Sequence, residues 1–224
     1  MNKIKYIAAV LIAIAGLGLQ QADAFTSLLN QGNQAISGFT GPYGAVNIDL
    51  IDSTHATITF QSFTSPDHAN IYLFGDGGSV AVNLNATTFA VSGITGSNAG
   101  TGFTPGPYTF AGAGQEDGFG SFNLTINSFD GFTHSSDTIT FTVTNTSGTW
   151  GSDSDVLAFN SDGFDAAAHI FVTAFPANAS NSALATGFAG EGPQPPGVPD
   201  GGTTVMLLGA ALGALGMARR FLMG

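Results

Sequence analysis

The sequence has no cysteine among its 224 residues, and it has almost no basic residues. Without cysteine, a disulfide framework, a thiolate metal site and a cysteine nucleophile are all excluded. The four basic residues stand at the extreme ends, so no Lys or Arg occurs between Tyr6 and Ala218: they are Lys3, Lys5, Arg219 and Arg220. This absence argues strongly against nucleic-acid binding, because Lys and Arg that neutralise phosphates supply most of that affinity.

Acidic residues are more frequent, and the net charge is -11. Thirteen of the 15 Asp and Glu residues, all but Asp23 and Asp200, lie between Phe25 and Val198. A divalent cation is therefore the natural charged partner of this region. Only 8% of the residues are charged, while 43% are hydrophobic and 32 are glycine. That composition favours glycine-turned β-structure over a charged helical bundle, and it argues against disorder.

Residues 1–24 have the pattern of a signal peptide. Lys3 and Lys5 precede an uncharged, largely apolar run over residues 6–19, and Ala22-Asp23-Ala24 supplies the small residues that signal peptidase requires. Cleavage is predicted before Phe25. An uncleaved membrane anchor is the alternative, which the shortness of the apolar run disfavours.

The other end of the sequence has three parts in a fixed order. A Pro- and Gly-rich linker and motif occupy residues 191–202, an apolar run occupies residues 203–218, and a basic tail occupies residues 219–224. As a helix, the 16-residue apolar run would cover about 24 Å, less than the roughly 30 Å hydrocarbon core, so we expect a marginal membrane span. The positive-inside rule would keep Arg219 and Arg220 in the cytoplasm.

The linker ends in the motif Val198-Pro199-Asp200-Gly201-Gly202, and the pair Arg219-Arg220 follows the apolar run. This order resembles the VPDSG variant of the PEP-CTERM sorting signal, with Gly201 in place of the serine and four extra residues after the arginines. The resemblance implies cleavage by an exosortase, a membrane cysteine protease of Gram-negative bacteria that make extracellular polysaccharide. It also implies anchoring in the inner membrane before processing, and then release to the cell surface or the extracellular space.

Residues 25–190 are predicted to form one all-β domain, an antiparallel β-sandwich or jelly roll, with a closed barrel as the alternative. The best block is 137–144, where Ile139, Phe141 and Val143 share one face and threonines share the other. Successive side chains of a strand point to opposite faces, so this alternation indicates a half-buried strand. Further strands are expected within residues 45–51, 55–60, 71–74, 79–84, 87–91, 121–127 and 169–175. Residues 92–118, with eight glycines and two prolines, are expected to form an exposed excursion between the sheets.

The densest acidic segment predicts a Ca²⁺ site in an irregular loop, because closely spaced oxygen ligands surround a glycine there. The predicted ligands are Asp153, Asp155, Asn160, Asp162 and Asp165. Turn formation explains the same residue types without a metal, since Asp and Asn cap turns and tolerate positive φ. No other cofactor is predicted.

Three further groups of residues have a functional and a structural interpretation. Glu116 and Asp117 are adjacent carboxylates, whereas a glycosidase needs two carboxylates that converge across the substrate, so a solvated loop explains the pair better. Residues 134–137 contain the residue types of a hydrolytic triad, but a polar turn before a strand explains them better. Four aromatic residues are candidates for a sugar-stacking platform or for core packing: Tyr43, Tyr72, Tyr108 and Trp150.

Together these patterns predict a non-enzymatic, exported surface or extracellular-matrix protein. Its expected role is structural or adhesive, in association with extracellular polysaccharide. The first alternative is a carbohydrate-binding module, either with or without a dependence on calcium. An extracellular hydrolase is less favoured, because no nucleophile elbow or convergent carboxylate pair is evident.

Overall fold

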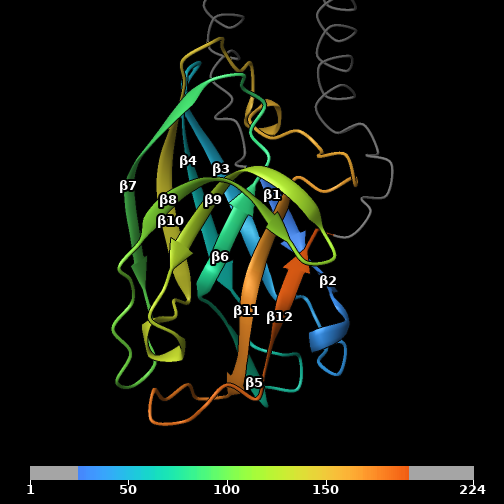
Figure 1. Ribbon diagram of the computed structural model, residues 1–224, viewed down its shortest axis with the longest axis vertical. Coiled ribbons are helices and arrows are strands. Elements are labelled where there is room, and N and C mark those ends of the chain that lie inside the picture. Colours follow the sequence, from blue (N-terminus) through green and yellow to red (C-terminus); the bar gives the residue numbers. More distant parts are fainter. Residues whose placement is uncertain (1–24, 192–224) are drawn as a thin grey trace, which may run out of the picture. The chain divides into compact units, whose positions relative to one another are not determined.

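The computed structural model describes residues 25–191, which fold into two antiparallel β-sheets (Figure 1). The first sheet has five strands: β1 (Phe25–Leu29), β3 (Gly44–Asp52), β4 (His55–Ser62), β10 (Thr138–Asn145) and β7 (Phe89–Ser97) in that order. The second sheet runs β2 (Gln31–Gly32), β12 (Ala185–Gly190), β11 (Ala166–Ala174), β6 (Asp76–Val82), β9 (Gly120–Ser128) and β8 (Thr109–Glu116), with β5 (Asn70–Phe74) also paired to β11. Three short 3₁₀ turns complete these residues: η1 (Gln34–Ile36), η2 (Phe132–His134) and η3 (Asp153–Asp155).

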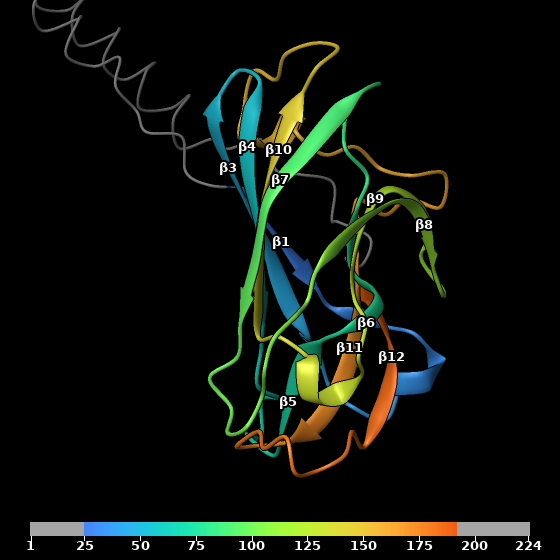
Figure 2. The same cartoon turned by 60° about the vertical axis from the view of Figure 1, so that its left-hand side comes forward.

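The two sheets stack as a sandwich, and the main core lies between them (Figure 2). In β10, Ile139, Phe141 and Val143 are fully buried, while the intervening threonines are partly exposed, as the alternation predicts. Phe60 of β4 is also fully buried, and its ring lies 6.0 Å from that of Phe74 in the opposite sheet and 6.5 Å from that of Phe141. The predicted all-β sandwich is confirmed.

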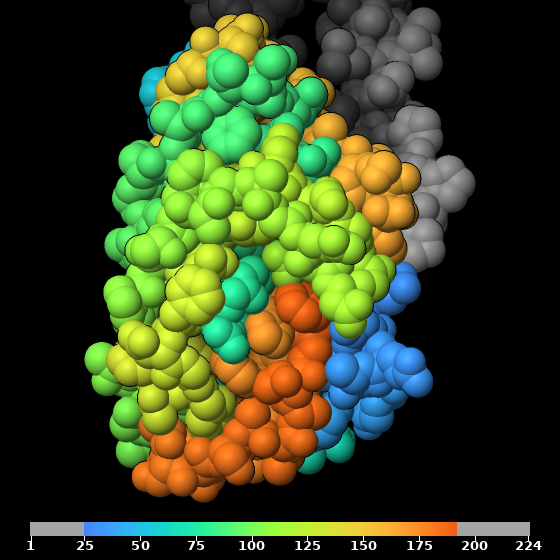
Figure 3. Space-filling model, in the orientation of Figure 1, coloured from blue at the N-terminus to red at the C-terminus, as the bar shows by residue number. Residues whose placement is uncertain are grey.

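The second sheet also has a partly covered outer face. β8 contacts β6 and β11, which are not its neighbours in hydrogen-bond order, because the sheet curls over itself at this edge. Phe119 and Phe122, in and beside the β8–β9 hairpin, pack there against Ala81 and Ala167. Figure 3 shows this face, with the yellow-green hairpin lying across a hollow in which the teal β6 and the orange β11 are visible.

The expectation of an excursion over residues 92–118 is wrong, because this stretch holds most of β7 and all of β8. The pairing of β7 with β10 changes register between Thr140 and Thr142, beside Gly93, and β8 changes register on both sides of Gly112. Each bulge inserts an extra residue and interrupts the two-residue alternation that identifies a strand. Gly96 has a further reason to be glycine, because a Cβ there would collide with the Tyr108 hydroxyl.

Two connections cross between the sheets at the same end of the sandwich. Residues 83–88 lead from β6 to β7, and residues 146–165 lead from β10 to β11. They are joined by backbone hydrogen bonds, in which Asn83 N donates to Asp165 O (2.8 Å) and Asn85 N donates to Val156 O (2.9 Å). The surface between these two connections is the candidate site.

Candidate functional site

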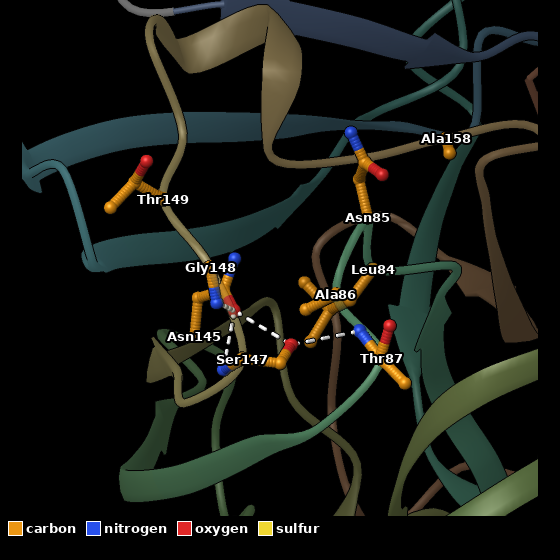
Figure 4. Close-up of a pocket in the computed structure, with 9 residues that line it drawn as sticks. All are labelled: Leu84, Asn85, Ala86, Thr87, Asn145, Ser147, Gly148, Thr149 and Ala158. Carbon is orange, nitrogen blue, oxygen red and sulfur yellow. Dashed lines mark hydrogen bonds between the residues drawn. The ribbon is translucent and has the colours of Figure 1, made fainter.

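An open depression of about 440 Å³ lies where the two crossover connections meet (Figure 4). Its first wall comes from the β6–β7 connection and its second from the end of β10 and the loop that follows. The lining residues are Leu84, Asn85, Ala86, Thr87, Asn145, Ser147, Gly148, Thr149 and Ala158. The depression is therefore built almost entirely from connecting segments that the two sheets hold in place.

Asn145, the last residue of β10, fixes the second wall. Its side-chain Oδ1 accepts hydrogen bonds from Ser147 N (3.0 Å), Ser147 Oγ (3.1 Å) and Gly148 N (2.9 Å). An Asn that bonds to the backbone two and three residues later is typical of a tight polar turn. Ser147 Oγ in turn accepts bonds from Thr87 N and Thr88 N, both at 3.1 Å. The two walls are thus tied together directly.

Trp150 supports the first wall through a side-chain hydrogen bond. It is buried, and its Nε1 donates to Asn85 O at 2.9 Å. Core packing, the favoured interpretation, is therefore confirmed for Trp150, and also for Tyr43 and Tyr72, which are buried in the main core. Tyr108 is half-buried and bonds through its hydroxyl to Ser136 Oγ. Three of the four rings therefore belong to the core, and Tyr108 is fixed to the sandwich through its hydroxyl.

The depression has no ionisable residue in its lining. Leu84, Ala86 and Ala158 supply apolar surface, whereas Thr87 and Thr149 supply hydroxyl groups from opposite walls (Figure 4). Both threonines are exposed, and neither hydroxyl forms a hydrogen bond within residues 25–191. The site can thus offer neutral donors and acceptors beside an apolar floor, which suits an uncharged polar ligand.

Two residues of the predicted calcium site lie in η3 and serve the backbone. Asp153 is buried, and its Oδ1 accepts a hydrogen bond from Leu50 N at 2.6 Å. Asp155 Oδ2 accepts from Gly151 N at 3.1 Å. The two carboxylates therefore stabilise different segments, one in β3 and one in the loop after Trp150.

The other three predicted ligands also have different surroundings. Asn160 Oδ1 accepts from Asp162 N and from Phe164 N, both at 3.0 Å, which closes a turn. Asp162 is exposed, and Asp165 is buried beside Glu191. Across residues 25–191, no three His, Asp or Glu side chains gather in a group that could hold a metal ion. The calcium site stays a prediction from the sequence.

The residues of the predicted sorting signal, Val198 to Gly202 with Arg219 and Arg220, lie outside the described part of the chain. A comparison with protein families matches residues 197–221 to the VPDSG-CTERM motif. The chain carries a VPDSG-CTERM sorting signal. The predicted resemblance is thereby confirmed, and the VPDSG-CTERM signal implies an exosortase-type processing partner and export to the cell surface or extracellular space.

No curated protein and no solved structure matches the chain. Two further predicted segments also lie outside the described residues. They are the signal peptide (residues 1–24) and the apolar membrane helix (residues 203–218), which falls within the VPDSG-CTERM match. Within residues 25–191, no helix has the length and apolar character to cross a membrane.

Two carboxyl side chains, those of Asp165 and Glu191, are buried together. Glu191 is the last described residue before the linker to the VPDSG-CTERM motif. Asp165 precedes β11 and Glu191 follows β12, and Glu191 N donates to Ala166 O at 3.3 Å. Asp165 is 6% exposed and Glu191 is 2% exposed. Burial raises the pKa of Asp165 to about 8, with further contributions from the hydrogen bond to Glu191 and from its charge. The raised pKa favours the protonated form of Asp165, which lets the two groups lie together without a cation.

Glu116 is a second buried carboxyl group, contrary to the expectation of a solvated loop. It is 1% exposed, and its Oε2 has no hydrogen-bond partner within the described residues. The curl of β8 places the carboxyl against Gly78 (φ +64°), where a Cβ would collide with it. Burial raises the pKa of Glu116 to about 8. Asp117, by contrast, is exposed and accepts a bond from Asn33 Nδ2 at 3.0 Å, so the two carboxylates do not converge.

The side chains of residues 134–137 also bond to different parts of the domain. His134 Nδ1 lies 2.6 Å from Gly106 O, and Asp137 Oδ1 accepts a hydrogen bond from Ser97 Oγ at 3.1 Å. Neither contact links the histidine to the serines or to the aspartate. The segment connects η2 to β10 and ties neighbouring loops to the sandwich.

Proposed function

We propose that the β-sandwich is a non-enzymatic module of the cell surface or extracellular matrix, with a structural or adhesive role. Residues 1–24 would act as a signal peptide, and residues 203–218 as a membrane helix that holds the chain until processing. The observation that carries this proposal is the VPDSG-CTERM signal on a chain that also contains a well-packed β-sandwich. A sorting signal of this kind delivers the domain to the cell exterior, where it meets extracellular polysaccharide.

The outer face of the first sheet supports an adhesive role. Thr57 and Thr59 of β4 lie opposite Thr142 and Thr140 of β10, and the hydroxyls of Thr59 and Thr140 are 3.1 Å apart. These side chains are partly exposed, so they form a ladder of hydroxyl groups across two central strands. A hydroxyl-bearing surface, with the carboxylate of Asp49 in β3 beside Thr57, suits many weak contacts with a hydrated polymer.

The proposal is tested in cells that make the protein. Cells that lack it are expected to show weaker cohesion and to lose polysaccharide from their surface, and re-expression of the complete chain restores both. A chain without residues 25–190, which keeps the two terminal segments, serves as the matched control and should not restore them. Cohesion and surface polysaccharide that stay the same in all four strains would contradict the proposed role.

A carbohydrate-binding module is the second candidate function, and the uncharged depression is the observation that favours it. The depression differs from the threonine ladder in being concave and held by internal hydrogen bonds. A concave, pre-organised site gains affinity because fewer groups must be ordered on binding.

A further inference from the structure

We propose that the depression between the two crossover connections binds neutral sugar units of an extracellular polysaccharide. This inference rests on the proposed surface role and goes beyond it by assigning a site and a ligand class. The volume of about 440 Å³ lies within the roughly 300–1,000 Å³ of ordinary ligand sites. Because the depression is open, a polymer can cross it without threading.

The chemistry of the lining matches a neutral sugar. A sugar ring presents hydroxyl groups at its rim and C–H groups on its faces, so it needs hydrogen-bonding groups beside apolar surface. Thr87 and Thr149 supply hydroxyls on opposite walls, and Ala86 and Ala158 supply apolar surface elsewhere in the lining. Asn85, whose Nδ2 donates to Asp155 O (3.0 Å), is exposed and keeps its side-chain Oδ1 as a further acceptor.

The site is also rigid. Three hydrogen bonds to Asn145 Oδ1 fix the loop that carries Thr149, and the bonds from Thr87 N and Thr88 N to Ser147 Oγ fix the facing wall. The hydroxyls that would meet the ligand take no part in these bonds. Their removal therefore leaves the internal support of the site intact, which makes them suitable for mutation.

The charge of the domain decides between neutral and acidic polysaccharides. Thirteen acidic residues and no Lys or Arg lie between Phe25 and Glu191. The resulting negative field repels uronic-acid and sulfated polymers, and the depression has no cation to offset that repulsion. A neutral ligand avoids this cost, so binding should depend little on ionic strength.

The test compares binding of the protein isolated from its own cells to three neutral polysaccharides, dextran, mannan and xyloglucan, and to the acidic polymer alginate. The chain with both Thr87→Val and Thr149→Val is measured beside the wild type by affinity electrophoresis and titration calorimetry. We expect at least one neutral polymer to bind, with a Kd that changes less than about twofold between 50 and 500 mM salt. The double variant should weaken binding about 10-fold or more, since each lost hydrogen bond accounts for roughly 3- to 10-fold.

Thr186→Val is the matched control, because Thr186 is exposed on β12 of the second sheet, outside both the depression and the threonine ladder. It should bind as the wild type does, and all variants should keep the wild-type unfolding midpoint. The inference is overturned if no neutral polymer binds, if alginate binds more tightly, or if the double variant binds as the wild type does. In those cases the cell-cohesion experiment still decides the surface role separately, because it does not depend on this site.

Discussion

Raising the pH from about 5 to about 9 is expected to lower the free energy of unfolding of the β-sandwich by several kcal/mol. Glu116 and Asp165 both have pKa values of about 8 in the folded chain, whereas an unfolded chain titrates such groups near pH 4. Between these values the folded state holds protons that the unfolded state has released. Stability therefore falls as the pH rises from about 4 to about 8 and then levels off.

Urea unfolding at a series of pH values measures this effect, and two neutral substitutions assign it. Glu116→Gln and Asp165→Asn remove one titrating group each, so each should flatten the pH dependence and raise stability at pH 9 by about 2–3 kcal/mol. Asp49→Asn changes an exposed carboxylate on β3 and is the control, with an effect within about 0.5 kcal/mol. A wild-type stability that is flat or rises over this range would contradict the buried, protonated state of the two acids.

Phe60→Ala is expected to destabilise the sandwich by about 3–5 kcal/mol, which is a large part of the stability of an ordinary domain. Phe60 is fully buried, and its ring contacts those of Phe74 and Phe141 from the two sheets. Truncation removes the apolar contacts and leaves a cavity that the sheets cannot close. The loss is read from the unfolding midpoint in urea, with an unchanged slope showing that the transition itself is the same.

Phe159→Ala provides the matched control for this experiment. Phe159 is 59% exposed in the connection between η3 and β11, so the same truncation should cost less than about 1 kcal/mol. Phe60→Leu should lie between the two, because it keeps most of the apolar volume. If Phe60→Ala and Phe159→Ala had equal effects, the sheets would not pack through Phe60 as described.

The strands that the sequence predicted best are those with unbroken alternation. β10 follows it from end to end and β4 follows it from His55 to Phe60, with every second side chain buried. Most of β7 and all of β8 escaped prediction because bulges beside Gly93 and Gly112 interrupt the period. β12 was missed for a different reason, since its sequence ATGFAG is too poor in large apolar residues to show an alternating pattern.

The depression could not be predicted from local pattern. Asn145 and Ser147 have the composition of an ordinary polar turn, and nothing in that turn indicates that Thr87 lies across from it. Their proximity depends on two chain crossings at one end of the sandwich, a property of the topology. The same holds for Glu116, because its burial follows from the curl of β8 over β6 and has no signal in the neighbouring residues.

The central claim, that this chain is exported and processed through its VPDSG-CTERM signal, is tested most directly by the mass of the native protein. The measurement is the intact mass, with both termini sequenced, of protein taken from the envelope and the culture fluid of its own cells. We expect a chain that begins at Phe25 and has lost the segment from about Val198 onward, including Arg219 and Arg220. A chain that retains Arg219 and Arg220 at its mature end would contradict processing by an exosortase.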